Sequence, residues 1–123
     1  LDVFGWAPAP DGDGLAARVA RLHTLAADDR QRSRAARREA EVLGQTGAFD
    51  AALAPAREAL RLAQRVGEPE LVAQARRMVG EVCAQLGRGG EAVLHLEAAL
   101  GWFDGHAGDE DRALMHAAVA VCI

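Results

Sequence analysis

Lysine, tyrosine and asparagine are absent from this sequence, and Ser33 is its only serine. Most of the usual nucleophiles and proton-transfer groups are therefore missing, and we expect a protein that is not an enzyme. Two cysteines in 123 residues are far too few for a disulfide-stabilised fold, which indicates a reducing, cytoplasmic compartment. No apolar run is long enough to span a membrane, and residues 1–10 lack the pattern of a secretory signal.

Aromatic residues are also scarce, at 4% of the chain, although 50% of the residues are hydrophobic. A chain whose apolar side chains are mostly small cannot build one thick core, and stacked thin repeats are the alternative. A shift of forty positions reveals such a repeat. The residues that recur identically are Arg37, Glu41, Val42, Gln45, Gly47, Ala52, Ala59 and Leu60, which return as Arg77, Glu81, Val82, Gln85, Gly87, Ala92, Ala99 and Leu100.

Apolar residues at helical spacing predict an all-α fold of six helices. The expected ranges are 15–27, 33–46, 50–66, 69–86, 92–103 and 109–123. Gly47, Gly67 and Gly87 are expected to end helices, because glycine adopts the left-handed conformation that follows a helix. Residues 1–14 are expected to be a leader or linker, and 15–123 a repeat domain that is a fragment of a longer array.

The helix turns and the second helices of the two units resemble the tetratricopeptide repeat (TPR) in its longer bacterial form of roughly forty residues. The residues that carry the resemblance are Thr46-Gly47-Ala48-Phe49-Asp50-Ala51-Ala52-Leu53 with Ala59-Leu60, and Leu86-Gly87-Arg88-Gly89-Gly90-Glu91-Ala92-Val93 with Ala99-Leu100. The resemblance implies antiparallel helix-turn-helix repeats stacked as a right-handed α-solenoid. It also implies a non-catalytic protein-interaction or signal-sensing scaffold within a larger bacterial regulatory protein, such as a transcriptional regulator.

In that family the first helices of the repeats line a concave groove that binds a peptide or a partner domain. The resemblance places eight candidate partner-binding residues there: Arg34, Arg37, Glu41, Gln45, Gln74, Arg77, Glu81 and Gln85. A ladder of this kind suits a peptide of mixed charge, with arginines available for carboxylates. The same spacing of four residues also permits Arg37–Glu41 and Arg77–Glu81 pairs within each helix, which is the structural alternative.

Two further hypotheses concern other parts of the chain. The apolar terminal helix suggests a homo-oligomerisation module, with self-association through Leu114, Met115, Val119 and Ile123. An arginine cluster at residues 30–38 suggests binding of nucleic acid or a phosphorylated ligand, although the net charge of −4 makes this segment an unfavourable nucleic-acid site. The histidines show no metal-ligand spacing, so we expect no metal and no cofactor.

Overall fold

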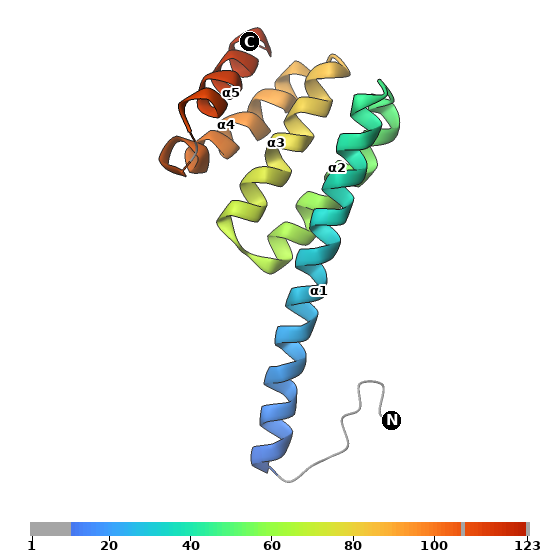
Figure 1. The fold of residues 1–123 in the computed structure, drawn as a ribbon, viewed down its shortest axis with the longest axis vertical. Coiled ribbons are helices and arrows are strands. Elements are labelled where there is room, and N and C mark those ends of the chain that lie inside the picture. Colours follow the sequence, from blue (N-terminus) through green and yellow to red (C-terminus); the bar gives the residue numbers. More distant parts are fainter. Residues whose placement is uncertain (1–10, 107, 123) are drawn as a thin grey trace.

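The computed structural model describes residues 11–106 and 108–122, and every regular element within them is a helix (Figure 1). The elements are α1 (Asp11–Gln45), α2 (Phe49–Val66), α3 (Pro69–Gln85), α4 (Gly89–His106) and α5 (Asp109–Cys122). The expectation of an all-α protein is confirmed. None of these helices has the combination of length and apolar character needed to cross a bilayer.

The expectation of six helices is wrong for the described residues, because the ranges 15–27 and 33–46 belong to one helix of 35 residues, α1. Between α2 and α3 the chain is broken by Gly67, whose φ of 81° is left-handed, and by Pro69 at the start of α3. Forty positions earlier stand Ala27 and Asp29, which allow the helix to continue. The N-terminal half of α1 consequently extends beyond the other helices (Figure 1).

Helix α1 begins inside the segment that we expected to be a leader. Asp11 is its first residue, so residues 11–14 are helical. The rest of the expected leader, 1–10, lies outside the described residues.

The forty-residue repeat is reproduced in the backbone of two helix turns. Gly47 and Gly87 have φ values of 82° and 79°. In the first turn the amide of Ala48 donates to the carbonyl of Leu43 at 2.9 Å, and forty positions later the amide of Arg88 donates to the carbonyl of Cys83 at 2.8 Å. These are the long hydrogen bonds of a Schellman motif, which satisfies carbonyls at the end of a helix. The forty-residue repeat of the sequence is therefore also a repeat of backbone conformation at these two turns.

The helices pack as consecutive pairs. Helix α1 packs on α2 and α3 packs on α4, while α2 contacts α3, α4 contacts α5, and α1 also contacts α3. One apolar cluster joins α1, α2 and α3 and extends to Ala92, the first buried residue of α4. A second joins Ala73 of α3 to the buried faces of α4 and α5. The contact between α1 and α3 places the two first helices of the repeats side by side.

Close packing within the second pair depends on Gly80. A Cβ atom added to Gly80 would lie 2.6 Å from Cγ of Leu96 on α4, and Leu96 is completely buried. At the equivalent positions of the first repeat stand Ala40 and Ala56, which are also completely buried. The glycine and leucine of the second repeat therefore correspond to two buried alanines of the same apolar cluster in the first repeat.

Candidate functional site

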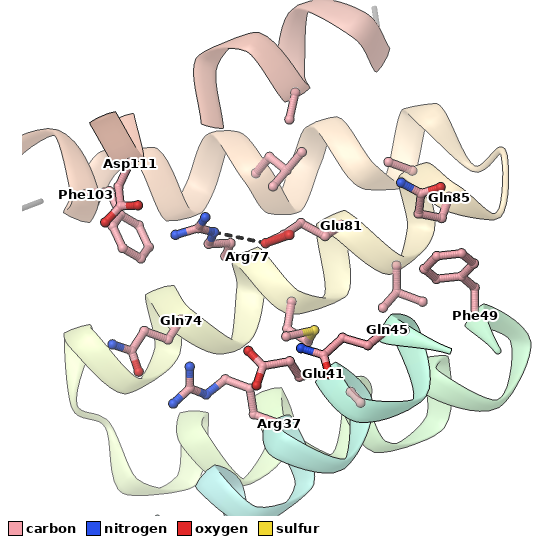
Figure 2. Close-up of a pocket in the computed structure, with 17 residues that line it drawn as sticks. Arg37, Glu41, Gln45, Phe49, Gln74, Arg77, Glu81, Gln85, Phe103 and Asp111 are labelled. Atoms are coloured by element: carbon pink, nitrogen blue, oxygen red, sulfur yellow. Dashed lines mark hydrogen bonds and ion pairs between the residues drawn. The ribbon is translucent and has the colours of Figure 1, made fainter. Parts of the chain in front are cut away.

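A groove of about 680 Å³ lies along the first helices of the two repeats (Figure 2). Seven of the eight expected partner-binding residues line it: Arg37, Glu41, Gln45, Gln74, Arg77, Glu81 and Gln85. They come from α1 and α3, which are separated in sequence by the whole of α2. The eighth, Arg34, is exposed and does not line the groove.

The groove also has an apolar lining, which the repeat pattern did not predict. Met78 and Val82 contribute from α3, Phe49 from the start of α2, and Phe103 from α4. Phe49 and Phe103 lie toward opposite ends of the groove (Figure 2). A surface that combines polar side chains with an apolar floor can bind an amphipathic segment.

The two groove arginines differ in their contacts. Arg77 donates from Nε to Oε1 of Glu81 at 2.9 Å, and its guanidinium carbon lies 5.7 Å from the centroid of the Phe103 ring. Arg77 is therefore supported from two sides, by Glu81 on its own helix and by Phe103 on α4. The intrahelical pair that the spacing permits is formed in this repeat.

The corresponding pair is not formed in the first repeat. Arg37 and Glu41 share the same spacing, but within residues 11–106 and 108–122 neither has an ion-pair partner. Nε of Arg37 is buried in the lining of the groove without a hydrogen-bond partner. Nδ1 of His95 and Nε of Arg112, which do not line the groove, are buried in the same way. What distinguishes Arg37 and Glu41 is therefore that both lie in the groove without an ion-pair partner among the described residues.

A smaller pocket of about 250 Å³ adjoins the groove between α3 and α5. Arg77 and Glu81 form one edge of it, and the remaining lining is apolar: Leu96, Leu114, Met115 and Ala118. We did not predict this pocket, although the repeat register contains a signal for it. Ala118 stands forty positions after Met78, so the third unit has a methyl group where the second has a full methionine side chain.

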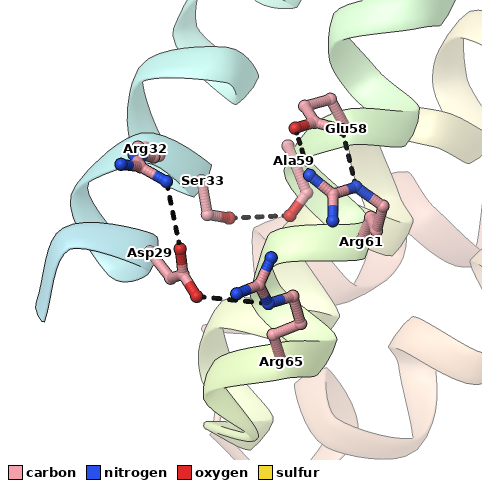
Figure 3. Close-up of polar contacts among 7 residues, drawn as sticks. All are labelled: Asp29, Arg32, Ser33, Glu58, Ala59, Arg61 and Arg65. Atoms are coloured by element: carbon pink, nitrogen blue, oxygen red, sulfur yellow. Dashed lines mark hydrogen bonds and ion pairs between the residues drawn. The ribbon is translucent and has the colours of Figure 1, made fainter. Parts of the chain in front are cut away.

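The arginine cluster at residues 30–38 is partly used for packing. Nη2 of Arg30 lies 2.5 Å from Oε1 of Glu68 in the turn before α3. Arg32 and Arg65 pair with Asp29, at 3.5 and 3.3 Å, and this carboxylate is nearly buried between α1 and α2 (Figure 3). These pairs reduce the positive charge available to an anionic polymer, so no observation favours a nucleic-acid interface here.

The expected self-association surface of α5 needs correction. Met115 and Val119 are only 2% and 9% exposed, because they pack into the cluster that joins α5 to α4. The large apolar side chains of α5 that are exposed are Leu114 and Val121, at 57% and 87%. Ile123 lies outside the described residues.

Two titratable side chains of the described residues, Cys83 and His95, have shifted pKa values. Among residues 11–106 and 108–122 no three histidine, cysteine or acidic side chains are grouped so that they could hold a metal ion. Burial, followed by the nearby Glu91 charge, raises the pKa of the Cys83 thiol. Burial, followed by the charge of Arg76, lowers the pKa of His95. Both side chains therefore favour their neutral forms.

No family model, curated protein sequence or solved structure matches this chain. The groove itself must therefore indicate the function. What its geometry defines is an all-helical, repeat-like protein in which polar residues of two successive units face one open groove.

Proposed function

We propose that this chain is a non-catalytic interaction scaffold that binds a peptide segment or partner domain in the groove between α1, α3 and α5. The observation that carries the proposal is the convergence of seven polar residues from two helices, with the unpaired Arg37 among them, on one groove of about 680 Å³.

The arrangement of the helices as a solenoid is part of the same proposal. The recurring Schellman turns and the contact between α1 and α3 support an array of helical repeats whose first helices lie side by side. That the array is a right-handed solenoid of TPR type is proposed from the resemblance alone. By that resemblance we propose a cytoplasmic, signal-sensing role within a larger bacterial regulatory protein.

A selection from a displayed library of random peptides tests the binding function. Wild-type protein is compared with Arg37→Glu, and Arg34→Glu is the matched control, because it makes the same charge change on the same helix outside the groove. We expect peptides selected on the wild type to lose binding to Arg37→Glu and to keep binding to Arg34→Glu. Equal binding to all three proteins would exclude the groove as the binding surface.

Self-association through α5 is the second candidate function, favoured by the exposure of Leu114 and Val121. Analytical ultracentrifugation over a range of concentrations tests it. A mass that rises with concentration in the wild type, but not after Val121→Asp, would assign the exposed face of α5 to a homo-oligomer.

A further inference from the structure

A second polar cluster lies outside the groove and joins α2 to the start of α4. Its centre is the carboxylate of Glu91 on α4. Nη2 of Arg57 on α2 donates to Oε2 of Glu91 at 2.7 Å, and Nη1 of Arg88, in the turn before α4, lies 3.8 Å from Oε1. Nε2 of His95 lies 4.0 Å from Oε2 of the same carboxylate. None of these four residues lines the groove.

Arg76 of α3 adds a further positive charge to this cluster. It has no ion-pair partner in the described part of the chain. Burial and then the charge of Arg76 lower the pKa of His95, Glu91 raises it to a smaller extent, and Arg57 lowers it again. The electrostatic potential at His95 is therefore positive, and Glu91 is the one acidic side chain of the described residues whose charge acts on it.

The charges of this cluster do not balance. Three arginines accompany one glutamate, which leaves an excess of two positive charges. In the groove, by contrast, two arginines accompany three acidic side chains. Cations held close together repel one another, and a bound anion offsets this repulsion. The cluster therefore favours an anion, whereas the groove does not.

The forty-residue repeat shows that helix packing does not require the cluster. The residues of the first repeat that correspond to Arg76, Arg88, Glu91 and His95 are Ala36, Ala48, Ala51 and Pro55. None of these four side chains is polar, yet the same turn and the same pair of helices form there. The charged side chains are therefore an addition to the second repeat.

We propose that Arg57, Arg76, Arg88 and His95 form a binding site for a phosphate group. A phosphate carries about −1.5 to −2 charges at pH 7, which matches the excess of positive charge. Arginine binds phosphate oxygens through paired N–H donors, and the neutral ring of His95 has one N–H to donate. Arg57 and Arg88 have about half of their side-chain surface exposed, at 49% and 53%, so a ligand can reach them. This site is separate from the groove and does not depend on peptide binding there.

Isothermal titration of the protein with inorganic phosphate, against sodium chloride at the same ionic strength, tests the site. We expect the wild type to bind phosphate, and we expect Arg76→Gln or Arg88→Gln to weaken this binding about tenfold or more. Arg61→Gln is the matched control, because Arg61 is an exposed arginine of α2 that pairs with Glu58 outside the cluster. Thermal unfolding by circular dichroism verifies that each variant is folded.

Glu91→Gln gives a test of opposite sign. This substitution removes the carboxylate that competes with phosphate for the arginines, so phosphate should bind about tenfold more tightly. If the arginines serve only to hold Glu91, the same substitution leaves phosphate binding unchanged or weakens it. Either of those results would overturn the proposal.

The imidazole of His95 reports the bound anion directly. Because the charges of Arg76 and Arg57 lower its pKa, a phosphate beside them should raise that pKa. NMR titration of the histidine ring signals in phosphate and in chloride measures the change, and His95→Gln identifies the signal. The signals of His106 and His116, which lie outside the cluster, should not respond to phosphate.

Two sources of the phosphate group are distinguished by the ligand that binds more tightly. A phosphoserine peptide of glycine and serine that binds more tightly than inorganic phosphate would assign the site to a phosphorylated partner protein. Equal binding of the two would assign it to a free phosphate compound, and both results support the site. Equal phosphate binding by the wild type, Arg76→Gln and Arg88→Gln would show a general salt effect and exclude the site.

Discussion

Replacing Gly80 with alanine should destabilise the protein even though alanine is the better helix former. Gly80 lies inside α3, where alanine favours the helix by about 1 kcal/mol. The added methyl group would lie 2.6 Å from Cγ and 2.8 Å from Cδ2 of Leu96, which is fully buried. Overpacking of this kind costs about 1–3 kcal/mol. We therefore expect a net loss of about 1 kcal/mol in the free energy of unfolding.

A double-mutant cycle with Leu96→Ala separates the clash from helix propensity. Leu96→Ala alone should cost about 2–5 kcal/mol, because it leaves a cavity in the core. In that background Gly80→Ala should be neutral or stabilising, since the propensity gain remains and the clash is gone. The double variant then has alanine at both positions, as the first repeat has at Ala40 and Ala56.

Urea unfolding followed by circular dichroism measures all four free energies. We expect a coupling energy of about 1–3 kcal/mol between the two positions. Additive effects, within about 0.5 kcal/mol, would mean that Leu96 moves aside without cost. That result would refute the close approach of α3 and α4 that the glycine at position 80 permits.

Three further predictions concern helix ends, the interface of α1 and the pH dependence of stability. Gly87→Ala should destabilise by about 1 kcal/mol because φ is 79° there. The same change at Gly101, a helical position with open space around it, should stabilise by up to about 1 kcal/mol. Ser33→Ala should cost about 0.5–1.5 kcal/mol in urea unfolding, because it removes a buried 2.8 Å hydrogen bond between α1 and α2; no change would exclude that bond (Figure 3). Arg57 donates to Glu91 and holds the pKa of that carboxyl below its ordinary value of 4.5. The Arg57–Glu91 pair therefore stabilises the fold above pH 4.5, and this contribution is lost as the pH falls through the lowered pKa. Glu91→Gln should make the free energy of unfolding less dependent on pH on the acid side. An unchanged dependence on pH would contradict this.

Helix ends and the repeat were predictable from the sequence because their causes are local. Glycine at 47, 67 and 87 relieves the steric cost of a left-handed residue, and all three positions have positive φ. The same local rule would also have predicted the continuity of α1, since Ala27 replaces the glycine that such a break requires. The resemblance implied a groove lined by the first helices, and seven of its eight candidate residues lie along one groove between α1 and α3, while their role in binding stays a prediction.

Tertiary structure decided the features that depend on neighbours distant in sequence. Arg37 and Arg77 have the same glutamate four residues later, yet only Arg77 forms the pair, and it lies beside the ring of Phe103 from another helix. Local spacing makes an ion pair available, whereas the surrounding helices determine which rotamer is favourable. The small pocket beside Ala118 likewise depends on the space between α3 and α5. The sequence by itself therefore determined the all-helical class, the forty-residue period and the helix ends at Gly47, Gly67 and Gly87, because these follow from backbone sterics and the spacing of apolar residues. Which charges stay unpaired and which cavities stay open was decided only by packing, since both depend on side chains from several helices at once.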